Sequence, residues 1–224
     1  MRHALTQGVS TDFVNFIKST PVFSYNLLII YMNWLKKTND MIKILALSSK
    51  EQTVLRTIFN LTDKFGIMTD IISENKDEFE ININDRWSAG QDLVHLIKVL
   101  KIVNIGFTLP KPILRLIYGI NKNNNRSFEQ LQMLYKSALD GGVKAPTIYV
   151  PKPVAYIDKD NLIQKHASLN KSFIDKLNNH TQYELDSYRL PHPILGKISL
   201  GELAIFTSFH TSHHYELLKS KLGH

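Results

Sequence analysis

The chain of 224 residues contains no cysteine. This absence excludes disulfides, iron–sulfur clusters, thiolate metal sites and cysteine nucleophiles, so a transition metal would have to be held by histidine and carboxylate. Glycine and proline are scarce, with ten and eight residues, which excludes a collagenous or loop-dominated protein. With 43% apolar and 21% charged residues, the composition is that of one globular domain, with room for an appendage.

A long apolar run is also missing. A helix that crosses a bilayer needs about 20 apolar residues. The most apolar stretch, residues 21–35, is shorter, contains Ser24, Asn26 and Asn33, and is followed by two lysines. It also begins late for a signal peptide and has no clear cleavage site. We therefore expect a cytoplasmic protein without a membrane partner, with a peripheral membrane helix as the alternative.

Charge of one sign is nowhere concentrated. The 27 basic and 20 acidic residues give a formal net charge of +7, but no block of five like charges occurs. No basic run is interleaved with aromatic residues, as it is in proteins that bind single-stranded nucleic acid. We therefore expect no nucleic-acid partner, and nucleic-acid binding is the weakest of three functional hypotheses.

The first 48 residues differ from the remainder, because their apolar residues follow no sustained helical period. We expect residues 1–48 to form an N-terminal extension of uncertain structure and residues 49–224 to form the main domain. Two interpretations of the extension stay open. It is either a weakly packed appendage that adds little to the core, or natural translation begins later, for example at Met41.

Apolar residues at helical spacing predict four long helices in the main domain. The first covers residues 51–73 and is followed by a polar loop to residue 86. In the second, Ser88 is the N-cap, Gln91 completes a capping box, and the helix ends at about residue 102 or 103. The third begins near Asp160 and ends at about residues 178–180. A loop, PHPILGKIS, leads to the fourth, which Ser199 caps and which covers residues 200–222.

Between the second and third helices lies a long connection, residues 104–158, interrupted by glycine, proline and asparagine. Short helices at residues 113–118 and 128–138 fit its pattern. A connection of this length often covers a functional site. The predicted fold class is therefore all-α, a four-helix bundle with one long crossover connection.

Histidines interrupt the apolar stripe of the last helix. His210 and His214 are four residues apart, so their side chains lie one turn apart on the same side and can reach one metal ion. His213 lies next to them, and His95 lies midway along the second helix. A third imidazole from a neighbouring helix would complete a three-nitrogen site with open coordination positions. Solvated histidines at the edge of the bundle are the alternative interpretation.

Two strings of residues resemble DinB-like proteins. The string WSAGQDLVHL, residues 87–96, is similar to the helix start W-S-x-x-E-x-x-x-H-L of that family. The string HPILGKISLGE, residues 192–202, and the later HTSHH, residues 210–214, are similar to H-P-x-x-G-x-L-T-x-x-E followed by H-x-x-H-H. The strings occur in the family's order, and the resemblance covers about residues 50–222.

The resemblance implies a DinB-like four-helix bundle that holds a divalent metal, most simply Zn²⁺ or Ni²⁺, through His95, His210 and His214. His213 matches an additional histidine that lies behind the ligands or faces the substrate. Gln91 replaces a glutamate that is common in the family, a change that keeps its capping role. Relatives include hydrolases and transferases that use low-molecular-weight thiols such as bacillithiol or mycothiol.

Three functional hypotheses follow. The first is a metal-dependent transferase or hydrolase that takes a small-molecule substrate and a thiol cosubstrate, with no catalytic side chain assigned. The second is a non-catalytic metal-bearing bundle that binds a small ligand or a partner protein, and the third is nucleic-acid binding. A homodimer is an open alternative to the monomer. Because protons compete with metal for imidazole nitrogens, metal affinity is expected to fall between roughly pH 7 and pH 5.

Overall fold

The structure is a computed structural model, and it describes residues 76–82 and 86–221 continuously. Upstream of these it describes residues 57, 61, 64–66, 68, 69 and 72 individually. The predicted extension, residues 1–48, lies outside the described residues. The predicted helix at residues 51–73 lies partly outside them, and its described members are all helical.

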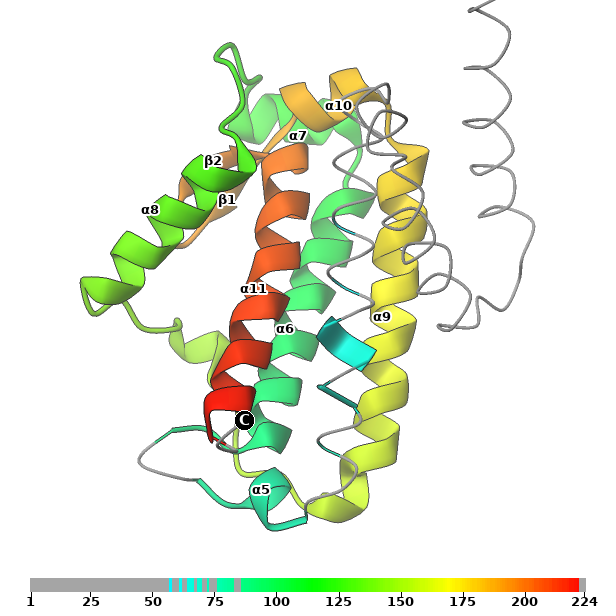
Figure 1. The fold of residues 1–224 in the computed structure, drawn as a ribbon. Helices are drawn as coiled ribbons and strands as arrows, with labels where there is room; N and C mark the ends of the chain where they lie inside the picture. The colour runs from blue at the N-terminus through cyan, green and yellow to red at the C-terminus, as the bar shows by residue number, and fades with distance from the viewer. Residues whose placement is uncertain are drawn as a thin grey trace, which may run out of the picture. The chain divides into compact units, whose positions relative to one another are not determined.

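The described part of the chain is mostly helical (Figure 1). Its helices are α5 (Lys76–Glu80), α6 (Ala89–Thr108), α7 (Lys111–Tyr118), α8 (Phe128–Asp140), α9 (Lys159–Asn179), α10 (Gln182–Ser187) and α11 (Leu200–Lys221). Single 3₁₀ turns occur at Thr147–Tyr149 and Tyr156–Asp158. Strands β1 (Arg189–His192) and β2 (Gly196–Ser199) form one antiparallel hairpin. The predicted all-α fold class is confirmed at this level.

Helix α6 is the central element of the fold, because it packs against both α9 and α11 (Figure 1). Asp92, early in α6, contacts Lys221 at the end of α11, whereas His95, further along α6, contacts His210, which lies earlier in α11. Helices α6 and α11 therefore run in opposite directions. Helix α8, from the crossover connection, packs on α11, so the connection covers one side of the α6–α11 pair.

A continuous hydrophobic core joins α6 to its neighbours. Its fully buried members include Phe79 from α5, Leu93 and Leu96 from α6, and Leu218 from α11. Met68, from the predicted first helix, belongs to the same core and is fully buried. Removing such side chains from water is the main stabilising term of folding, at about 25 cal/mol per Å² of apolar surface. This core holds the start of α6 firmly against the end of α11.

The predicted caps fix where α6 and α11 begin. The Ser88 side chain accepts from the Gln91 amide while the Gln91 side chain accepts from the Ser88 amide, which confirms the capping box. Ser199 and Glu202 make the same reciprocal pair, at 3.1 and 2.9 Å. The Arg126 guanidinium also donates to both carboxylate oxygens of Glu202, at 2.7 and 3.0 Å. This ion pair fastens the crossover connection to the start of α11.

Three sequence predictions of local structure were wrong. Helix α6 does not end at residue 102 or 103 but continues to Thr108. Gly106 does not break it, because the missing side chain makes room for Leu190, whose Cδ1 would lie 2.5 Å from an added Cβ. The loop PHPILGKIS contains most of the β1–β2 hairpin, with Gly196 at a φ of 73° directly after the turn. The polar loop at residues 74–86 contains α5, which buries Phe79.

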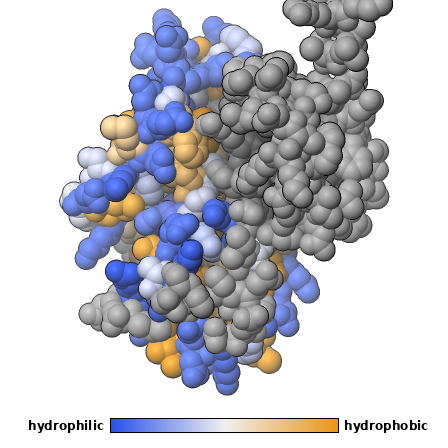
Figure 2. Space-filling view, viewed as in Figure 1, coloured by the Kyte–Doolittle hydropathy of each residue, from blue (hydrophilic) through white to orange (hydrophobic). Residues whose placement is uncertain are grey.

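Apolar surface remains exposed on the described part of the chain. Leu116 on α7 and Ile157 after it are 86% and 90% exposed. On the face seen in Figure 2, hydrophobic patches are separated by hydrophilic ones. Within the described ranges, no individual helix combines the length and apolar character that a membrane crossing requires. Helices α6 and α7 together meet these two criteria, with a bend of 103° between them.

Candidate metal centre

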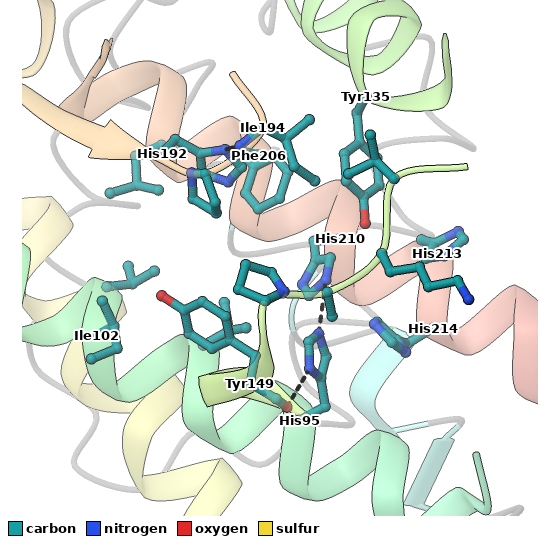
Figure 3. A pocket seen from close by; sticks show the side chains of 18 of the residues that line it. His95, Ile102, Tyr135, Tyr149, His192, Ile194, Phe206, His210, His213 and His214 are labelled. Carbon is teal, nitrogen blue, oxygen red and sulfur yellow. Dashed lines mark hydrogen bonds between the residues drawn. The ribbon is translucent and has the colours of Figure 1, made fainter. Parts of the chain in front are cut away.

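Three histidines from two helices converge in the interior (Figure 3). His95 comes from α6, and His210 and His214 come from successive turns of α11. All three are buried, at 4–5% exposure, and one ligand nitrogen of each lies within 4.8 Å of the others. The prediction that the three rings meet is therefore confirmed. The four-residue spacing places two rings on one side of α11, and the antiparallel packing of α6 adds the third.

The outward nitrogens of two rings are already engaged. His95 Nδ1 lies 3.0 Å from the carbonyl oxygen of Tyr149, and His214 Nδ1 lies 2.9 Å from Asp92 Oδ1. Each of these acceptors requires a proton on Nδ1, so Nε2 of both rings is left as a lone-pair donor. Metal-binding histidines in proteins are usually held in this way, by a carboxylate or a carbonyl on the far side of the ring.

The separations fit a shared ion. Nitrogens bound at about 2.0–2.1 Å to one tetrahedral ion lie about 3.3 Å apart. His95 Nε2 and His210 Nε2 lie 3.3 Å apart. The widest separation in the triad, up to 4.8 Å, would have to shorten by roughly 1–1.5 Å. The Nδ1 of His210 has no hydrogen-bond partner among the described residues, so this ring lacks the outer support that the other two have.

Burial favours the neutral form of His95 and His210, which is the form that binds metal. Burial, with the nearby His214, lowers the pKa of His95 to about 4. Burial and the neighbouring histidines lower the pKa of His210 well below its ordinary value. Burying a cluster of imidazole nitrogens costs free energy when these nitrogens have no hydrogen-bond or metal partner. A shared metal ion would offset that cost.

Asp92 holds the triad from behind. Its carboxylate lies between His214 and Lys221, whose Nζ is 2.7 Å from Oδ2. Burial alone would raise the pKa of Asp92, but the hydrogen bonds and charge interactions with His214 and Lys221 outweigh it and lower that pKa. Asp92 is therefore ionised and keeps the proton of His214 on Nδ1.

Replacing Asp92 by asparagine is expected to weaken Zn²⁺ binding by about 10–100-fold, because the side chain keeps its shape but loses the charge that orients His214. The affinity can be measured by competition with a chromophoric chelator. Asp175→Asn is the matched control, since the Asp175 side chain is 57% exposed and pairs with Lys171 on the surface of α9. Equal affinities of the two variants would contradict the role of Asp92.

A cavity of about 760 Å³ opens beside the triad. His213 lines it, with its ring edge-on to Tyr135 at a centroid distance of 5.9 Å, so this histidine faces the cavity rather than the back of the ligands. Burial, with the nearby His214, lowers the pKa of His213 to about 4. Tyr135 and Tyr149 stand on the crossover side of the cavity (Figure 3). This placement favours a substrate-facing position for His213 over a supporting one.

Several residues that complete the site were not predicted from the sequence. Asp92 precedes His95 by three residues, a spacing that places both on one face of α6 and could have drawn attention to it. Trp87 packs its ring against His95, at a centroid distance of 5.0 Å. Tyr149 contributes only a backbone oxygen, which no sequence pattern marks. Lys221 lies two turns beyond His214 on α11.

Comparison of the chain with protein-family models, with curated proteins and with solved structures finds no match. The resemblance to DinB-like proteins therefore rests on the motif residues themselves. Those residues are the cap of α6, the hairpin before α11, and the three convergent histidines.

Proposed function

We propose that this chain is a DinB-like protein, a four-helix bundle that holds one divalent metal ion through His95, His210 and His214. The observation that carries the proposal is the convergence of three buried imidazoles, two of them from one helix and one from its antiparallel neighbour. Further support comes from the Asp92 carboxylate and the Tyr149 carbonyl, which orient two of the rings. Outer partners of this kind are usual for histidines that bind metal.

Zn²⁺ or Ni²⁺ is the proposed ion. Three neutral imidazoles form a nitrogen donor set of intermediate softness, which suits both ions, and Zn²⁺ sites with three protein ligands keep a position open for water or substrate. No thiolate competes, because the chain lacks cysteine. A carboxylate is close, but both oxygens of Asp92 already bind His214 and Lys221.

The proposed reaction is transfer or hydrolysis with a low-molecular-weight thiol as cosubstrate. A metal ion with open positions supplies Lewis acidity, which lowers the pKa of a coordinated water or thiol. Asp92 and Tyr149 hold two of the rings in place, and their other side faces a mostly apolar cavity wall. His213 and Tyr135 line the same cavity and stand where a substrate would contact them. The thiol has to come from outside, because the chain has none.

A non-catalytic metal-bearing bundle is the second candidate. The observation in its favour is the size of the cavity, because about 760 Å³ is within the range of small-molecule binding sites. Such a bundle would bind the same small ligand, or a partner protein, without turnover. A cytoplasmic location, independence of nucleic acid and membrane, and a monomer or homodimer complete the proposal.

The test is turnover by the Zn²⁺- or Ni²⁺-loaded protein. Cysteine or bacillithiol is offered with chlorodinitrobenzene or an epoxide as electrophile, and p-nitrophenyl acetate serves as a hydrolytic substrate. Thiol- or ester-dependent turnover that disappears in His210→Ala and after chelation is expected for the enzyme. Metal binding without turnover of any of these substrates would favour the second candidate, and absence of metal binding would exclude both.

A further inference from the structure

The cavity beside the triad is long and follows α6. Its wall contains His95, Val99, Ile102, Gly106 and Leu109, which are spaced by four, three, four and three residues. This spacing keeps all of them on one side of the helix. At 1.5 Å per residue, the row from His95 to its last member extends over about 20 Å. The cavity is therefore elongated, with the three histidines toward one end of the row.

Helix α11 forms the facing wall in the opposite direction. Its His210 meets His95 at the triad end. Leu203 and Phe206 lie one to two turns before His210 in α11, and they line the cavity beside the later part of α6. At the far end, Leu190 packs against Gly106. Two apolar rows thus run antiparallel away from the triad, covered by residues of α8 and of the 143–150 segment.

Ionised groups gather at the triad end. Four aspartate, lysine and arginine side chains line the cavity, and three of them, Arg86, Asp92 and Lys221, belong to that end. Lys221 binds Asp92, and Arg86 Nη1 lies 3.4 Å from Ser220 Oγ at the end of α11. Toward the other end the titratable side chain of His192 lines the wall. Burial, with the nearby Arg126, lowers the pKa of His192 to about 4, so this ring is neutral.

We propose that the cavity binds an elongated apolar chain whose polar, reacting end lies at the triad. An unbranched alkyl or acyl chain has this shape, and an apolar wall attracts it in proportion to the surface that it removes from water. The position of the reacting end rests on the proposed function, whereas the binding of the chain rests on the cavity wall alone. The substrate class would then be an amphiphile with a long apolar tail.

Binding of straight-chain primary alcohols to the metal-free protein tests the chain site. Alcohols from butanol to dodecanol are measured by displacement of an environment-sensitive dye, so neither a metal nor an ionised head group is needed. Each added methylene should tighten binding roughly fourfold, until the chain fills the cavity and the gain stops. Affinity that does not depend on chain length would overturn the proposal.

Two blocking variants locate the site. Val99→Trp and Ile102→Trp place an indole four and seven residues beyond His95, about 6 and 10 Å along α6. The chain length at which further methylenes no longer tighten binding should be shortest in Val99→Trp, intermediate in Ile102→Trp and longest in the unaltered protein. Ile102 is 49% exposed, so its variant should fold, as circular dichroism can verify. Leu116→Trp is the control, because Leu116 is exposed on α7 and outside the cavity wall.

The outcomes separate this inference from the metal proposal. The same limiting chain length in the unaltered protein and in both blocking variants would overturn the chain site, even if Zn²⁺ binds tightly. A graded limit with an unchanged control would support it, even if Zn²⁺ does not bind. In that second case the proposed metal function fails and the chain site stands.

Discussion

Replacing His95, His210 or His214 by alanine is expected to lower the affinity for Zn²⁺ and Ni²⁺ by more than about 100-fold. Loss of an outer partner of a metal ligand already costs about 10–100-fold, and loss of the ligand itself should cost more. The three variants should behave alike, because each leaves only two nitrogens at the site. Isothermal titration, or competition with a chromophoric chelator, gives the affinities directly.

His213→Ala is the matched control for these variants. It removes an imidazole from the same helix and the same cavity, beside His214 but outside the triad. Its metal affinity should stay within a few-fold of the unaltered protein. If all four variants bind metal equally well, the triad is not the metal site. If His213→Ala is as severe as the others, the ligand set has been assigned incorrectly.

Features carried by local sequence could be predicted. The capping box at Ser88 and the N-cap at Ser199 follow from the sequence, because each needs only neighbouring residues. The apolar period of α9 and α11 placed these helices within one or two residues of their observed ends. The pair His210 and His214 was found in the same way, from a spacing that one helix fixes.

Features that depend on contacts between different elements were missed. Gly106 stands inside α6 because Leu190, 84 residues later, occupies the space of its absent side chain. The hairpin after α10 has strands of four residues, too short for a clear alternating pattern, and one of them contains Pro191. At the site, the carbonyl of Tyr149 reaches His95 only because the crossover connection folds back over α6. Sequence patterns describe periods within one helix or strand. The Gly106–Leu190 contact, the β1–β2 pairing and the Tyr149–His95 contact each join two different elements.

The structure changes the predicted pH dependence of metal binding. From ordinary imidazole behaviour, metal affinity is expected to fall between roughly pH 7 and pH 5. Burial, however, lowers the pKa of His95 and His192 to about 4 and that of His166 to about 3. His210 is lowered as well, chiefly by burial. Protons should therefore compete with metal for His95 and His210 only in more acidic solution than an ordinary imidazole would require.

The same lowered pKa values make the metal-free protein sensitive to acid. In the unfolded chain a histidine takes up a proton near pH 6.5, whereas His95 and His192 stay neutral in the folded chain until about pH 4. The unfolded state then binds more protons over this interval, so the free energy of unfolding decreases as pH falls from 6.5 to 4. Each fully buried histidine contributes roughly 2–3 kcal/mol to this loss, against a usual total of about 5–15 kcal/mol.

We expect the metal-free protein to lose most of its stability between pH 6.5 and pH 4, as followed by melting temperature or by urea unfolding. His166 allows one contribution to be isolated, since it lies on α9 away from the triad, stacked on Phe65 and beside Asn170. His166→Gln keeps an acceptor for the Asn170 amide but cannot take up a proton. The free energy of unfolding of this variant should fall less steeply as pH is lowered. The difference in slope should correspond to about one proton fewer taken up on unfolding.

Bound metal should raise the curve of melting temperature against pH without changing its shape, until protons displace the metal from the triad. Bound Zn²⁺ or Ni²⁺ stabilises the folded state by mass action, so the melting temperature with excess metal should lie above the metal-free value from pH 7 to about pH 5. The two curves should converge near pH 4, where protons reach His95. Curves that coincide at every pH would show that the triad binds no metal. A melting temperature that is constant from pH 7 to pH 4 would show that the histidines are not held neutral by burial.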